Sequence, residues 1–192
     1  MRYLILLIFA PIAFDSFGQT EPEMNVIYGD QHIFTISTPE GWVNDKVAAS
    51  TIGLVSFLYH KEDANKNPKS HMYAMGYDKD ENNKDLESFM NGDMANFKKK
   101  YPNLTYEQIE TGKSGAIIDA QMLSYSNLDD RYKEEVVYLE TEFSVLVFVF
   151  STFKEQDYKS YQQVFDQFMA SFNYRGNNPK PFLEWQKQQS GN

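Results

Sequence analysis

The chain has 192 residues, of which 42% are hydrophobic and 16% aromatic, and its formal net charge is −9. This length suits one domain with at most a tail, and the aromatic content excludes an acidic disordered chain. The absence of cysteine excludes disulfides, thiolate metal sites, a cysteine nucleophile and a lipoprotein anchor. The acidic balance disfavours nucleic acid as a partner, because few counterions would be released from its phosphates.

The N-terminus has the pattern of an export signal. Arg2 precedes an apolar stretch over residues 3–14, and the small residues Ser16 and Gly18 follow two positions apart. This arrangement predicts a cleaved secretory signal over residues 1–18. A retained membrane anchor is the alternative, but the stretch is shorter than the ~20 residues of a spanning helix. We therefore expect a periplasmic or secreted bacterial protein with no membrane span after cleavage.

The first half of the mature chain alternates short β-rich segments with turns and polar loops. After a flexible lead-in over residues 19–24, the pair Gly29-Asp30 predicts the turn of a hairpin. Residues 61–70 contain no large apolar side chain, so we expect a solvated loop there. The strands expected in this half are residues 26–28, 33–37, 52–59 and 72–77.

Two segments carry apolar side chains at the 3.6-residue spacing of an amphipathic helix. The first begins at Leu86 and stops before Pro102, and three lysines stand at its end, as the helix dipole favours. The second follows residues 152–155, Thr-Phe-Lys-Glu, which have the form of a capping box. We expect both stripes to face the core. They are Leu86, Phe89, Met90, Met94, Phe97 and Tyr101, and Tyr158, Tyr161, Phe165, Phe168, Met169 and Phe172.

Between the helices we expect three strands, at residues 116–123, 135–142 and 143–153. The last is apolar on both faces, because Val145, Val147 and Val149 alternate with larger apolar side chains. A strand of this kind has to be covered on both sides, and the two helices are the natural covers. Short connections favour antiparallel neighbours. The sequence thus predicts an α+β fold: a three-layer αβα sandwich whose central, mainly antiparallel sheet is covered by one long helix on each face.

The end of the chain is more polar. We expect a single domain over residues 25–175 and an exposed C-terminal tail over residues 176–192. Phe182, Leu183 and Trp185 interrupt the polar composition of this tail. Two interpretations stay open: the aromatic residues pack back onto the domain, or they dock a partner. Phe182 and Trp185 are the candidate binding residues.

The motifs of common catalytic and ligand sites are incomplete. Residues 112–114, Gly-Lys-Ser, resemble the end of a phosphate-binding loop, but Glu107 stands where that loop needs glycine. The acidic run at residues 78–82 is spaced like a calcium loop, but Phe89 occupies the position of the bidentate glutamate. There is no G-x-S-x-G nucleophile turn. We therefore predict no cofactor and no catalytic residue.

The histidines are the remaining candidates for catalysis or metal binding. Only His32, His60 and His71 could serve as a general base. His60 and His71 close the two ends of the polar loop, so they could face each other and bind zinc with Glu62 or Asp63. This arrangement is the basis of an alternative function, a small metal-dependent hydrolase. No fixed metal-ligand spacing supports it, so we prefer solvated histidines at the loop edges.

The order of the expected elements, together with one short segment, resembles the PsbP-like family. That segment is residues 34–42, Phe-Thr-Ile-Ser-Thr-Pro-Glu-Gly-Trp, and the likeness spans residues 25–174. The family includes relatives of the PsbP subunit of photosystem II and of a Ran-binding nuclear import factor. The resemblance implies an αβα sandwich without shared catalytic residues, and its members act as binding or assembly subunits. Trp42 is then a core anchor.

The sequence as a whole predicts an exported, non-catalytic binding or assembly module of the bacterial envelope. We expect an envelope or secreted protein as its partner and a monomer or weak oligomer as its own state. The expected structural anchors are Trp42, Phe148, Phe150, Phe165 and Phe168.

Overall fold

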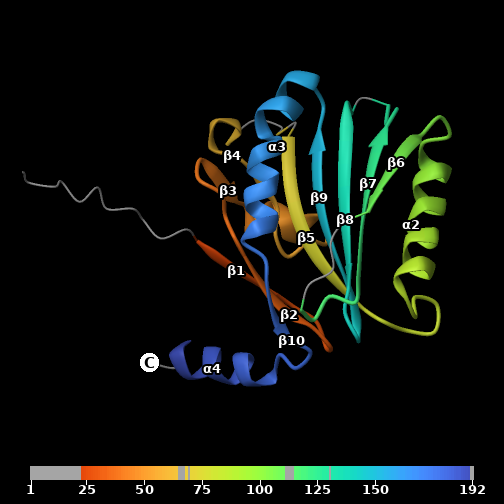
Figure 1. The fold of residues 1–192 in the computed structure, drawn as a ribbon. Helices are drawn as coiled ribbons and strands as arrows, with labels where there is room; N and C mark the ends of the chain where they lie inside the picture. Colours follow the sequence, from red (N-terminus) through yellow and green to blue (C-terminus); the bar gives the residue numbers. More distant parts are fainter. Residues whose placement is uncertain (1–22, 65–67, 69, 111–114, 130, 191–192) are drawn as a thin grey trace, which may run out of the picture.

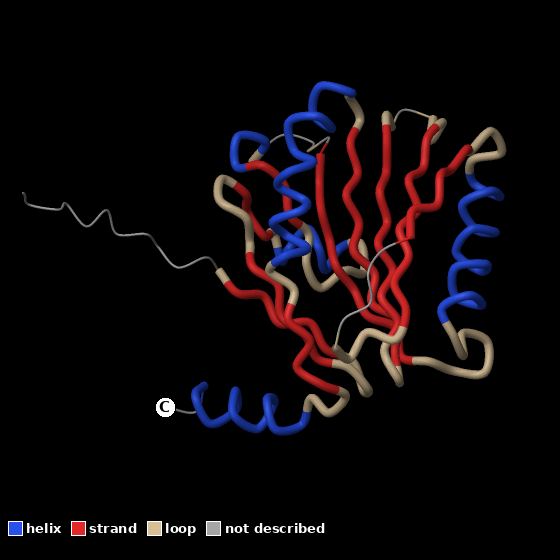
Figure 2. The backbone as a smooth tube through the Cα atoms, viewed as in Figure 1, coloured by secondary structure: helices blue, strands red, loops and turns tan. Residues whose placement is uncertain are grey.

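The computed structural model describes residues 23–64, 68, 70–110, 115–129 and 131–190 (Figure 1). The predicted export signal and the Gly-Lys-Ser segment lie outside these residues. In the described part of the chain the strands, red in Figure 2, form a seven-stranded sheet in the order β3-β4-β5-β9-β8-β7-β6 and a three-stranded sheet in the order β1-β2-β10. Every pairing between these strands is antiparallel. The α+β class and the large antiparallel sheet are confirmed.

The bounds of the elements are as follows. The strands are β1 (Met24–Tyr28), β2 (Ile33–Ser37), β3 (Trp42–Asn44), β4 (Leu58–His60), β5 (Ser70–Asp78), β6 (Thr105–Glu110), β7 (Asp119–Ser126), β8 (Lys133–Glu140), β9 (Ser144–Thr152) and β10 (Asn173–Gly176). The α-helices are α1 (Lys46–Thr51), α2 (Leu86–Lys100), α3 (Glu155–Ala170) and α4 (Lys180–Ser190), and a 3-10 turn spans Lys61–Asp63.

Strand β9 lies at the centre of the large sheet and is buried along its whole length. One set of its side chains, which includes Phe148, joins a core with α3 and the three-stranded sheet, and we call this the α3-side core. The alternate set, which includes Val147, joins a core with α2, the α2-side core. The two long helices therefore pack on opposite faces of the seven-stranded sheet, as the two-faced pattern of β9 predicted.

The helix caps differ from the expected ones. Asp85 caps α2, since its carboxylate accepts a hydrogen bond from the Ser88 amide at 2.8 Å, and the Ser88 hydroxyl completes a capping box. The capping box predicted for the second helix is wrong. Thr152 is the last residue of β9 and is buried, and the N-cap of α3 is Lys154, whose side chain makes no capping bond.

Several strand predictions need correction. Residues 52–59 were expected to be one strand, but the strand at this point is β4, Leu58–His60. Helix α1 ends just before the expected strand, at Thr51. Asp45 caps α1, because its carboxylate accepts a hydrogen bond from the Ala48 amide at 2.8 Å. The strand expected from residue 116 begins at Asp119. Strand β6 was not expected, and α4 lies within the predicted tail.

The three-stranded sheet is attached to β5 through a buried histidine. His32 is 2% exposed, and its Nδ1 lies 2.8 Å from a carboxylate oxygen of Asp78 at the end of β5. The same carboxylate accepts hydrogen bonds from the amides of Asp30 and Gln31 in the hairpin turn, at 2.9 and 3.0 Å. Gly76 makes room for the ring, because a Cβ at this position would lie 2.2 Å from His32 Nε2.

We expect Gly76→Ala to destabilise the fold, because the added methyl group must displace the buried His32 ring. The free energy of unfolding should fall by about 1–3 kcal/mol, the usual cost of overpacking. Urea denaturation measures this change. The matched control is Gly92→Ala in α2, where a Cβ meets nothing within 4 Å, and where alanine should be neutral or stabilising. Equal stability of the Gly76 variant and the natural chain would contradict the packing described.

Candidate functional site

A row of polar side chains crosses the seven-stranded sheet on its α2-side face. In register, Tyr59 of β4 lies opposite His71 of β5, His71 opposite Ser151 of β9, Ser151 opposite Glu134 of β8, and Glu134 opposite Tyr125 of β7. Residues directly opposite each other in antiparallel strands point to the same side of the sheet. These five residues, which we call the polar row, therefore share one face although they come from five different strands.

An open groove of about 500 Å³ lies at one end of this face, beside α1. Aromatic and apolar side chains form much of its lining, which also includes an aspartate, a histidine and an arginine from separate parts of the chain. The lining residues used below are Phe57, Tyr59, Phe153, Asp45, His71 and Arg131.

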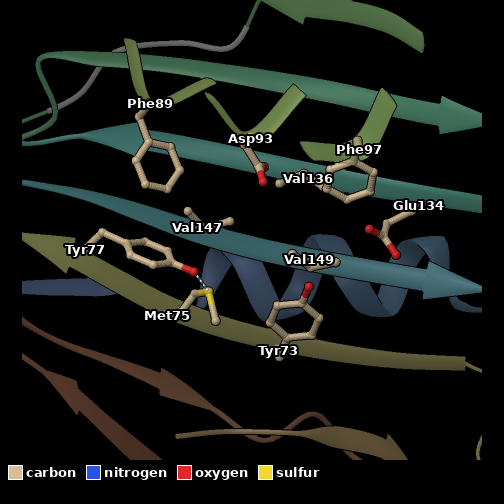
Figure 3. A pocket seen from close by; sticks show the side chains of 10 residues that line it. All are labelled: Tyr73, Met75, Tyr77, Phe89, Asp93, Phe97, Glu134, Val136, Val147 and Val149. Carbon is tan, nitrogen blue, oxygen red and sulfur yellow. Dashed lines mark hydrogen bonds between the residues drawn. The ribbon is translucent and has the colours of Figure 1, made fainter. Parts of the chain in front are cut away.

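A smaller cavity of about 70 Å³ lies between α2 and the sheet. Part of its wall is apolar, with Val147 and Val149 of β9 on the sheet side and Phe89 of α2 opposite. Figure 3 shows the hydroxyl of Tyr73 and the carboxylates of Asp93 and Glu134 directed into this space. The cavity therefore combines an apolar wall with a few convergent polar groups.

An ion pair joins the groove to the cavity. Arg131 lines the groove, Glu134 lines the cavity, and their side chains meet at 2.5 Å. The Glu134 side chain is 3% exposed, so burial raises the pKa of its carboxyl, and the charge of Arg131 opposes that rise. The guanidinium of Arg131 also lies 6.0 Å from the centre of the Tyr101 ring. Arg131 is therefore held between a buried carboxylate and an aromatic face.

His71 is the histidine of the groove. Burial, with the neighbouring charge of Arg131, lowers the pKa of its imidazole to about 4. Its Nδ1 is buried and has no hydrogen-bond partner among the described residues. At neutral pH the ring is therefore uncharged and weakly basic, which suits hydrogen bonding better than proton abstraction.

Asp45 supplies a fixed negative charge at the α1 side of the groove. Its carboxylate accepts hydrogen bonds from the Ala48 amide at 2.8 Å and from the Tyr59 hydroxyl at 2.9 Å. These bonds, the one from Ala48 first, lower the pKa of the Asp45 carboxyl. The groove thus carries a negative charge on one side, at Asp45, and a positive charge on another, at Arg131.

Asp93 projects from α2 toward the sheet and places a carboxyl group in the cavity wall. Its carboxylate accepts a hydrogen bond from the Tyr138 hydroxyl at 2.5 Å. Burial raises the pKa of Asp93, and the hydrogen bond only partly offsets this effect. Burial also raises the pKa of Tyr138, and the negative charge of Asp93 adds to the rise, so this tyrosine stays neutral.

The structure separates the two histidines of the metal-site alternative. His60 pairs with Trp42 and stacks on Tyr161 of α3 at 5.6 Å, on the α3-side face. His71 is on the α2-side face, opposite Tyr59. Among the described residues no three metal-ligating side chains come together. The metal-dependent hydrolase is therefore not the function that this geometry favours.

The other predicted residues lie elsewhere in the fold. His32 belongs to the junction between the two sheets. The expected anchors all lie in the α3-side core: Trp42, Phe148, Phe150, Phe165 and Phe168. Phe182 and Trp185 are on α4, with ring centres 5.9 Å apart, and Trp185 is 54% exposed.

The sequence interpretation missed the polar row and the groove. The sequence did contain one indication of the polar row: two adjacent charged residues, Glu134 and Glu135, in a segment whose other residues are typical of a buried strand. Finding the row also requires the register of β4, β5, β9 and β8, which no local pattern supplies.

The comparisons with known proteins bear on the fold. No family model matches the chain, and no curated protein matches it. Among solved structures it is similar to the solution structure of cyanobacterial PsbP (CyanoP) from Synechocystis sp. PCC 6803, with a TM-score of 0.53 and 14% identity. The match covers 81% of this chain and 95% of that one. The chain has the PsbP-like fold.

The PsbP-like fold agrees with the resemblance inferred from the sequence, and at this identity the likeness concerns the fold alone. Within the described residues, no helix has the length and apolar character that crossing a membrane requires.

We expect Asp93→Asn to stabilise the chain at neutral pH. The raised pKa of Asp93 means that the folded state binds a proton more readily than the unfolded state. The contribution of protonated Asp93 to the stability of the fold is thus fully present below the usual pKa of 3.8. It is lost as the pH rises through the raised pKa. Asparagine removes the charge and keeps an acceptor for Tyr138.

Urea denaturation as a function of pH measures this effect. The variant should unfold at a higher urea concentration than the natural chain at pH 7, and the difference should disappear toward pH 3.8. Glu107→Gln on the exposed strand β6 is the control and should change neither value. An advantage of Asp93→Asn that is independent of pH would disprove the role assigned to burial.

Proposed function

We propose that the mature chain is an exported, non-catalytic accessory module that binds a partner protein in the bacterial envelope. The observation that carries this proposal is Trp185, a large aromatic side chain that α4 leaves 54% exposed. The PsbP-like fold is compatible with such a role, because folds of this kind supply surfaces without fixing a reaction.

Helix α4 has the features of a docking element. Trp185 and Phe182 lie with ring centres 5.9 Å apart and form an aromatic pair on the helix. In Figure 1 α4 lies beside the end of the three-stranded sheet, away from α2 and α3. Exposed tryptophan is enriched among the residues that contribute most to protein–protein binding. We therefore assign the aromatic pair to the contact with the partner.

The chemistry of the histidines supports binding over catalysis. With a pKa lowered to about 4, His71 is too weak a base to remove a proton efficiently at neutral pH. His32 is bonded to Asp78 in the core, and His60 packs against both Trp42 and Tyr161. None of these placements joins a histidine to a nucleophile in a catalytic arrangement among the described residues.

We expect Trp185→Ala to weaken binding of the partner. Residues 19–192 would be immobilised, incubated with envelope extract of the source organism and crosslinked. The bound protein would then be produced in pure form and titrated by calorimetry. Loss of the tryptophan ring should weaken binding by at least tenfold, as expected for an interface hot spot. The control is Gln188→Ala, an exposed position of the same helix. Equal affinity of both variants would exclude α4 as the docking element.

We expect residues 1–18 to direct export. A fusion of residues 1–24 to an enzyme that is active only outside the cytoplasm should give extracytoplasmic activity. N-terminal sequencing of the exported full chain should begin at Gln19, because the small residues Ser16 and Gly18 fit a signal-peptidase site. Replacing Ile5 and Leu6 by aspartate should stop export by interrupting the apolar stretch. A chain that keeps its first residues after secretion would disprove cleavage.

A further inference from the structure

We propose that the groove beside α1 binds a small organic acid, with its carboxylate at Arg131 and His71 and its apolar body against Phe57 and Tyr59. This site lies on the α2-side face and is separate from α4, so it does not depend on the proposed function. The argument rests on size, on hydrogen-bond donors and on the distribution of charge.

The dimensions of the groove suit a small molecule. Its volume of about 500 Å³ falls within the roughly 300–1,000 Å³ of typical ligand pockets. The Phe57 ring lies 5.0 Å from the His71 ring and 6.0 Å from the Tyr59 ring, centre to centre, so three rings form one wall. Such a wall favours a flat, apolar ligand body.

The polar end of the groove offers donors in excess of its acceptors. The guanidinium of Arg131 carries five N–H donors, and among the described residues its side chain donates one hydrogen bond, to Glu134. The imidazole of His71 also lines the groove, and in its neutral form it carries one further N–H donor. A carboxylate only accepts hydrogen bonds, and its planar shape fits the guanidinium. An anionic oxygen pair is thus the group that this end fits best.

Asp45 limits the ligand to one carboxylate. Its own carboxylate is ionised and lies on the α1 side of the groove, where the apolar body of the ligand would rest. A second carboxylate on that body would meet a like charge, which discriminates against diacids. The groove should therefore prefer monoacids, and it should bind neutral analogues poorly because Arg131 and His71 would then lack an acceptor.

The test uses residues 19–192 and three probes of similar shape: 2-naphthoate, 2-naphthalenemethanol and 2,6-naphthalenedicarboxylate. Calorimetry should show 2-naphthoate binding at least tenfold more tightly than the alcohol and the diacid. Equal binding of the acid and the alcohol would overturn recognition of the carboxylate. No binding of 2-naphthoate at millimolar concentration would overturn the site itself.

Two tryptophan substitutions on α1 locate the binding. Thr51 is exposed and lines the groove, so Thr51→Trp should fill it and weaken 2-naphthoate binding by at least tenfold. Val47, on the same helix, is 77% exposed and is not among the lining residues, so Val47→Trp is the matched control and should bind normally. Binding that survives Thr51→Trp, or that is lost equally in both variants, would overturn the placement.

The outcome of the 2-naphthoate experiment is independent of the outcome of the partner-binding experiment. Trp185→Ala should leave 2-naphthoate binding unchanged, because α4 contributes no residue to the groove lining. Thr51→Trp should leave capture of the partner protein unchanged for the same reason. A result against the acid site would thus leave α4 docking standing, and a failed capture would leave the acid site standing.

Discussion

The fold depends on the burial of β9 from both sides. All nine residues of this strand are buried, and its alternate side chains enter two separate cores. Fully burying a valine, leucine or phenylalanine side chain contributes roughly 1.5–3 kcal/mol relative to leaving it exposed. Loss of either helix would expose one set of these side chains to water. The stability of α2 and of α3 is therefore tied to the same strand, although the two helices do not share a face.

The two faces of the sheet are covered unequally, and this follows from simple dimensions. Strands are spaced about 4.8 Å apart, so seven of them span roughly 29 Å, whereas a helix with its side chains is about 10–12 Å wide. One helix cannot cover such a face. On the α3 side, β1, β2 and β10 add a second layer next to α3, and Phe34 packs on Phe148 at 5.6 Å. On the α2 side, the additional cover beside α2 is the short helix α1, and the open groove lies next to α1.

The sequence allowed prediction of the elements that carry a strong repeat. The apolar alternation of β9 and the helical stripes of α2 and α3 are periodic over many residues, so their type and burial follow from pattern alone. Strand β6 is an edge strand, and its side chains at residues 105–109 are exposed. Its mixed composition, Thr-Tyr-Glu-Gln-Ile-Glu, gives no apolar alternation from which a strand could be predicted. Helix α1 has six residues, too few for a stripe. The α3 cap was mistaken because Thr152 is held in β9 by pairing to Lys133 and Ser70.

The site was beyond prediction for a different reason. Its residues come from the α1 cap, β4, β5 and the turn before β8, and only tertiary pairing brings them to one face. The Arg131–Glu134 pair, with Glu134 buried and Arg131 partly exposed, is a poor source of stability, because removing a carboxylate from water costs about as much as the attraction returns. What the carboxylate does achieve is to fix a guanidinium, with Tyr101 behind it, at the wall of an open groove. Holding a cation in place before a ligand arrives reduces the ordering cost of binding. The energetically costly position of Glu134 is thus better explained by the placement of Arg131 than by the stability of the fold.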